Sequence, residues 1–196
     1  MKNRDKSIWL LLFTNIVFIV AAIKGQYSFP QILMTYWVQS VIIGLFNFFK
    51  ILSLKNFSTK DFSMNGKSVK NTTRTKINVA FFFLFHYGTF HLVYLIFILV
   101  EHGRRSVDLS LLGWAALGFF LNHLFSAVYN YRTTSQKENI GQVMFFPYLR
   151  IIPMHLVIIF GSAMGQGAFV FFMLLKTAVD SIMHWLEHRQ PVGGNV

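Results

Sequence analysis

Long uninterrupted runs of hydrophobic residues alternate with short polar segments along this chain. A helix needs roughly 20 mostly apolar residues to cross the hydrocarbon core of a bilayer, and most of the runs reach about that length. They are continuous rather than alternating, and they are much longer than the strands of a membrane barrel. Because backbone groups in lipid must be paired internally, such runs predict helices. The predicted spans are residues 7–23, 30–52, 78–100, 109–131, 143–163 and 166–188.

The pattern therefore predicts an all-α fold class, with residues 1–196 forming a single domain that is a polytopic transmembrane helical bundle of six spans. The fifth span is the least regular, because it contains Pro147, Arg150 and Pro153. The first span also fits a signal peptide, since it has a basic start and small residues near its end. Its apolar stretch is longer than the roughly 7–15 residues of a signal core, and cleavage would leave five spans in the same orientation.

The positive charges indicate the orientation of these spans. The formal net charge is +11, and only 13% of the residues are charged. If the N-terminus is cytoplasmic, the outside connections hold only Lys24, Arg104 and Arg105, and Lys176 lies within the last span. The other 14 of the 18 Lys and Arg residues then fall on the cytoplasmic side, as the positive-inside rule requires. The sequence thus predicts a multi-pass protein of the cell inner (plasma) membrane with both the N-terminus and the C-terminus in the cytoplasm.

Residues 53–76 form the one long polar connection, rich in Lys, Asn, Ser and Thr. We expect a mobile cytoplasmic loop, with the lipid bilayer and its anionic headgroups as partners at this face. The basic residues are not interleaved with solvent-facing aromatic residues, so nucleic acid is not an expected partner. The chain contains no cysteine, which excludes disulfides, thiolate metal sites and thiol catalysis.

Ionisable residues inside the predicted spans are the candidate functional groups, because their burial in lipid is costly and usually serves a function. In the sixth span, Lys176, Asp180 and His184 are spaced four apart and therefore share one helix face. Lys176 and Asp180 could neutralise each other. Alternatively, Asp180 and His184 could bind one metal ion, since side chains four apart on a helix converge.

Three further histidines are expected at a similar level of the bilayer. At about 1.5 Å per residue, His86 and His123 each lie roughly 12 Å from the cytoplasmic end of their spans. His155 falls in the same half of the membrane. The predicted metal ligands are His86, His123, His155, Asp180 and His184, holding zinc or iron.

Four functions fit these residues. One is a metal-dependent membrane enzyme acting on a lipid-soluble substrate, with Lys176 and Asp180 as catalytic residues. The alternatives are a small proton-coupled carrier, suggested by the prolines of the fifth span, and a haem-binding electron-transfer protein. The last is a non-catalytic membrane partner subunit. The sequence does not decide whether the chain is an enzyme.

A structural role is the alternative for each polar residue. His91 sits about 140° around the helix from His86, so we expect it to be structural or to face outside. An intramembrane histidine such as His86 often forms only a hydrogen bond to another helix. The same expectation applies to Gln39, Asn47 and Asn122.

Four segments together resemble a family of uncharacterised bacterial six-span integral membrane proteins. They are Trp37–Gly44, His86–His91, Asn122–Ser126 and Pro153–His155. The resemblance covers most of the chain except the polar connection, and it implies the six-span architecture but no activity. It also implies an acidic residue at the position of Gln39, so this departure argues against a charge role there.

Overall fold

The computed structural model describes residues 28–64, 66–102, 107–133, 138–164 and 167–189, so the predicted first span lies outside the described residues. The chain divides into two compact units. One unit contains residues 30–148, and the other contains Phe29 together with the described residues from Leu149 onward.

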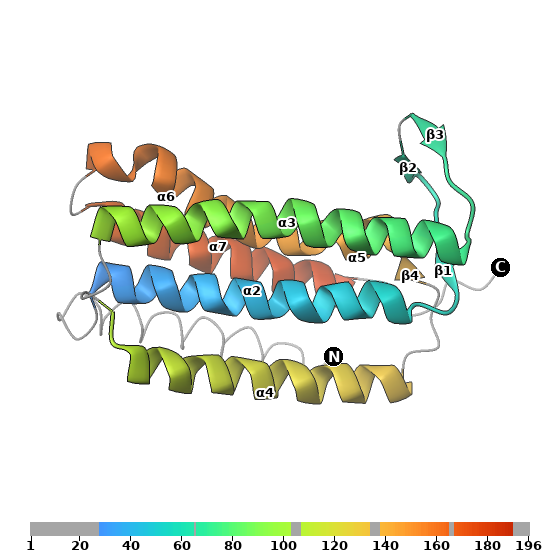
Figure 1. Ribbon diagram of the computed structural model, residues 1–196, viewed down its shortest axis with the longest axis horizontal. Helices are drawn as coiled ribbons and strands as arrows, with labels where there is room; N and C mark the ends of the chain where they lie inside the picture. The colour runs from blue at the N-terminus through green and yellow to red at the C-terminus, as the bar shows by residue number, and fades with distance from the viewer. Residues whose placement is uncertain (1–27, 65, 103–106, 134–137, 165–166, 190–196) are drawn as a thin grey trace. The chain divides into compact units, whose positions relative to one another are not determined.

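Three long helices dominate the first unit: α2 (Phe29–Ser53), α3 (Thr73–His102) and α4 (Leu109–Thr133). Helix α2 lies between α3 and α4 (Figure 1). The buried Gln31 of α2 accepts a hydrogen bond of 2.6 Å from the backbone N–H of Asp108. The carboxylate of Asp108 in turn accepts from the backbone of Ser110 and Leu111, which stabilises the start of α4.

A short helix, α5 (Ile140–Phe145), follows in the first unit and packs against α3. It continues into the 3₁₀ helix η2 (Phe146–Arg150), within which the chain passes from the first unit to the second. The second unit contains α6 (Ile151–Met164) and α7 (Gly167–Arg189), which pack against each other.

The observed helices follow the predicted ranges closely, with one difference. Residues 143–163, predicted as one span, are divided among α5, η2 and α6. Within the described residues, three helical segments are long and apolar enough to cross a membrane, namely Phe29–Ser53, Thr73–Glu101 and Ile140–Val157. The segments Leu109–Phe125 and Val170–Val179 are apolar but shorter.

Large apolar side chains are exposed along these helices. Phe85 on α3, Trp114 on α4 and Phe125 on α4 are each more than 70% exposed. Soluble monomers rarely expose apolar surface on this scale, because its contact with water is unfavourable. Helix length, composition and exposed apolar surface together identify the chain as a membrane protein.

The polar connection between α2 and α3 contains short strands, which the prediction of an all-α chain did not include. Strand β1 (Phe57–Ser58) pairs in parallel with β4 (Glu138–Asn139), and β2 (Ser63–Met64) forms an antiparallel hairpin with β3 (Lys67–Ser68). Strands of two residues leave no detectable alternation in the sequence, so the hydrophobic pattern could not predict them.

Side-chain contacts hold this connection to the helices around it. Asn71 Nδ2 donates to the Phe57 carbonyl at 2.7 Å, and Lys76 Nζ donates to the Leu54 carbonyl at 3.0 Å. Asn139 Nδ2 donates to the Lys60 carbonyl at 2.8 Å. The ring of Phe57 is only 2% exposed. These contacts give residues 53–64 and 66–76 a defined structure.

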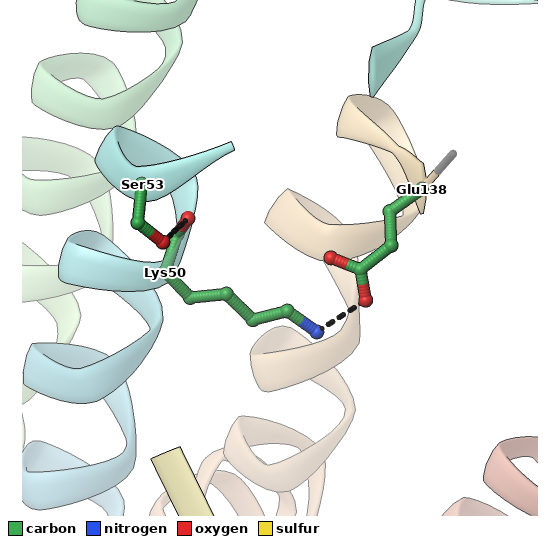
Figure 2. A network of polar contacts seen from close by, with 3 residues as sticks. All are labelled: Lys50, Ser53 and Glu138. Atoms are coloured by element: carbon green, nitrogen blue, oxygen red, sulfur yellow. Dashed lines mark hydrogen bonds and ion pairs between the residues drawn. The ribbon is translucent and has the colours of Figure 1, made fainter. Parts of the chain in front are cut away.

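An ion pair connects the end of α2 to β4 in the first unit. Lys50 Nζ, in the last turn of α2, lies 2.7 Å from Oε1 of Glu138 in β4 (Figure 2). The Ser53 hydroxyl donates to the Lys50 carbonyl at 2.8 Å and so satisfies one of the acceptors left over at the helix end. Both charged side chains remain partly exposed.

Candidate functional site

A buried hydrogen-bonded pair joins α2 to α3. The Tyr87 hydroxyl donates to the backbone carbonyl of Ser40 at 3.0 Å. Because that single hydrogen is used, the 2.8 Å contact between the two hydroxyl groups is a bond from Ser40 Oγ to Tyr87. Both residues are buried, and both hydroxyl groups are satisfied. This pair has the features of a structural contact within a membrane bundle.

His91, one turn further along α3, is also engaged in the packing. Its Nδ1 lies 2.9 Å from the Tyr87 carbonyl, and a carbonyl only accepts, so Nδ1 carries a hydrogen. Its ring stacks on the Tyr87 ring with centroids 4.2 Å apart. Trp37 Nε1 of α2 donates to the His91 carbonyl at 2.7 Å. The buried His91 therefore takes part in the packing of α3 against α2.

His86 differs from His91 because it is exposed on α3. Its Nδ1 lies 2.9 Å from the hydroxyl of Tyr148, which belongs to η2. The imidazole stacks on Phe82 with an interplanar angle of 13°, and Phe90 presents an edge to it. These contacts fix the orientation of a titratable ring on the apolar surface of the first unit.

Tyr148 is held from the other side by the aromatic residues of α3. Its ring makes edge contacts with Phe83 and Tyr87, at centroid distances of 5.8 and 5.5 Å. The phenol thus connects the buried stack of Phe83, Tyr87 and His91 to the exposed His86. The hydrophobic pattern of the sequence did not predict this contact.

The helix break at η2 positions Tyr148. Pro147 has no N–H, so the Val143 carbonyl cannot accept the hydrogen bond that a continuous helix would supply. The chain tightens into 3₁₀ geometry over Phe146–Arg150 and resumes as α6, where Pro153 lies in the tolerated first turn. The result is a helix interrupted within a membrane-length apolar segment, with a hydrogen-bonded histidine beside the interruption.

The other predicted site residues are distributed over both units. His123 of α4 is half-buried in the first unit, with its ring 5.9 Å from that of Phe46 in α2. In the second unit, His155 of α6 is exposed and Lys176 of α7 is half-buried. The side chains of Asp180 and His184 lie outside the described residues, although the backbone of α7 includes both positions.

Within the described side chains, no three His, Cys, Asp or Glu residues lie close enough together to hold a metal ion. Because Asp180 and His184 are not among those side chains, this finding does not test the predicted ligand set.

The side-chain amide of Asn47 does not donate the interhelical hydrogen bond that we expected of it, within the part of the chain that the structure describes. Among the described residues, its buried Nδ2 has no hydrogen-bond partner. A buried unpaired donor is unfavourable, so this amide is a weak point in the packing of α2.

Comparison with known proteins identifies the family. Residues 1–193 match a family described as "Family of unknown function (DUF6498)", and the chain belongs to that family. No curated protein and no solved structure matches the chain.

Proposed function

We propose that the chain is a six-span protein of the bacterial inner membrane with both ends in the cytoplasm. The proposal is supported by helices α2, α3, α4 and α7, whose bounds lie close to those of the second, third, fourth and sixth predicted spans. The distribution of Lys and Arg supports the orientation, since only three fall in the predicted outside connections. Residues 53–76 and the strands that they form then lie on the cytoplasmic side.

Within this architecture we propose a small proton-coupled carrier. The observation that carries the proposal is the hydrogen bond between His86 and Tyr148 at the interruption of a membrane-length helical segment. Interrupted helices are typical of transport sites, because their free backbone groups can bind a substrate or an ion. Histidine is the side chain that most readily exchanges a proton near neutral pH.

Protonation of His86 changes what Tyr148 can bind. In the neutral tautomer with hydrogen on Nε2, Nδ1 accepts from the Tyr148 hydroxyl. The protonated ring has hydrogen on both nitrogens, so Nδ1 must donate and the Tyr148 hydrogen must turn to another acceptor. Proton binding at His86 is thereby coupled to a change at the helix break, which proton-coupled transport requires.

The test uses purified protein in liposomes with an imposed pH gradient and an internal pH dye. Small solutes are added in turn, and a transported solute dissipates the gradient faster than in empty liposomes. His86→Gln keeps a hydrogen-bonding side chain but cannot titrate, so we expect it to abolish the coupled proton flux. His155→Gln serves as a matched control and should leave the flux intact. Equal flux in wild type and His86→Gln would rule out His86 as the coupling group.

A metal-dependent membrane enzyme is the second candidate, and the course of α7 favours it. Because α7 is a continuous helix over Gly167–Arg189, Lys176, Asp180 and His184 occupy one side of it. Elemental analysis of untagged protein, with an absorption spectrum, tests this candidate. About one zinc or iron per chain, lost in Asp180→Ala and in His184→Ala, would support it. A metal content unchanged by both substitutions would remove this site from consideration.

A further inference from the structure

We infer that residues 53–76 form a binding surface for anionic phospholipid headgroups, one that the structure holds in a defined shape. The inference rests on α2 and α3 being membrane spans and is independent of the carrier proposal. The segment connects the end of α2 at Ser53 to the start of α3 at Thr73. If both helices cross the bilayer, this connection must lie at the level of the headgroups on one side.

The charge of this surface is almost entirely positive. Asp61 is its only acidic residue. Five basic side chains are exposed on it, namely Lys55, Lys60, Lys67, Lys70 and Arg74.

Two further cations, Lys50 and Lys76, make contacts within the protein. Lys50 is paired with Glu138 at 2.7 Å, and Lys76 donates to the Leu54 carbonyl. The Glu138 carboxylate is therefore engaged with Lys50, at the end of α2. An anionic lipid surface supplies the complementary charge.

The strands and packing contacts of this surface distinguish it from an unstructured basic loop. The hairpin of β2 and β3 turns at Gly66, whose φ of +73° lies in the left-handed region that favours glycine. Phe62 packs against Gly141 of α5 so tightly that a Cβ at Gly141 would lie 2.8 Å from the Phe62 ring. Because the backbone is already ordered, lipid binding does not have to offset the conformational entropy of a disordered segment. Figure 1 shows the hairpin projecting from the end of the first unit at which α2 ends and α3 begins.

The test compares lipid binding by the delipidated full chain in an uncharged detergent. Phosphatidylglycerol or phosphatidylcholine is titrated in, and retained lipid is counted by native mass spectrometry. We expect wild type to prefer phosphatidylglycerol, and the triple variant Lys60→Gln, Lys67→Gln, Lys70→Gln to lose at least about tenfold of that preference, given the usual contribution of each cation. The triple Lys→Arg variant at the same positions should retain it.

A charge-matched control removes three cations that we place on the other face of the membrane, by Lys24→Gln, Arg104→Gln and Arg105→Gln. This control should bind phosphatidylglycerol like wild type. The wild-type preference should also fall as salt rises, a measurement that does not depend on any variant folding. A salt-independent preference, an unchanged preference in the Lys→Gln variant, or tighter binding of polyglutamate or an oligonucleotide than of phosphatidylglycerol would overturn the proposal.

Discussion

The ring of Tyr87 occupies the space that a side chain at Gly44 would need. A Cβ at Gly44 would lie 2.4 Å from Tyr87 Cε1, which is too close for any relaxed contact. We therefore expect Gly44→Ala to separate α2 from α3 and to lower stability by about 1–3 kcal/mol. The thermal unfolding midpoint in detergent measures the effect. Gly88→Ala is the control, because nothing lies within 4 Å of a Cβ there. A thermal unfolding midpoint for Gly44→Ala equal to that of wild type would show that α2 and α3 do not approach this closely in the folded protein.

The hydrogen bond between His86 and Tyr148 predicts an energetic coupling. Tyr148→Phe and His86→Ala each remove one partner, and the double variant removes both. The stability losses of the two single variants should together exceed the loss of the double variant by about 0.5–1.5 kcal/mol, the usual net value of one hydrogen bond. Chemical unfolding of all four proteins in the same detergent gives the coupling. Strict additivity would mean that the two side chains do not interact.

The unpaired amide of Asn47 predicts a stabilising substitution. Replacing Asn47 with Leu keeps a similar volume and removes a buried donor that lacks a partner among the described residues. We expect stability to rise by about 1 kcal/mol, since the desolvation cost of the amide disappears. Ser40→Ala provides the opposite case, because its hydroxyl is satisfied by Tyr87 and its loss should destabilise. If Asn47→Leu destabilises the protein, the amide has a partner that remains to be identified, such as a bound water or substrate.

The ion pair of Lys50 and Glu138 predicts a small, salt-dependent effect. The two side chains are 50% and 29% exposed, so solvent screens their attraction. Glu138→Gln should cost at most about 1 kcal/mol at low salt, and the difference from wild type should shrink as salt rises. Unfolding curves at two salt concentrations measure this. A large, salt-independent loss would show that Glu138 has a role other than pairing with Lys50.

The helices could be predicted from the sequence because each span repeats the same physical requirement over some 20 residues. The predicted start of the second span at Pro30 lies one residue from the observed start of α2 at Phe29. The interruption of the fifth span was partly predictable, since Pro147 and Pro153 indicate weakened helix geometry. The placement of Tyr148 beside His86 was not, because that contact depends on how each helix is rotated, which hydrophobic runs do not specify.

The predicted metal ligands illustrate the same limit. Equal depth along separate helices does not imply contact, and within the first unit His86 and His123 have different surroundings. His86 is oriented by Tyr148 and Phe82, whereas the His123 ring lies near Phe46. His91 was easier to interpret. It lies five residues from His86 and therefore on a different face of α3. Its side chain is buried where α3 contacts α2.

The pairing of β1 with β4 has a consequence for the order of events during synthesis. The hydrogen bond from Asn139 to the Lys60 carbonyl joins residues 79 apart, with α3 and α4 between them. At a translation rate of about 5–20 residues per second, Lys60 is synthesised roughly 4–16 s before its partner Asn139. A nascent chain arrested after α3 would therefore present the basic hairpin without β4, Glu138 or the Gly141 surface. Protease accessibility of arrested chains should fall abruptly once residues 138–141 emerge.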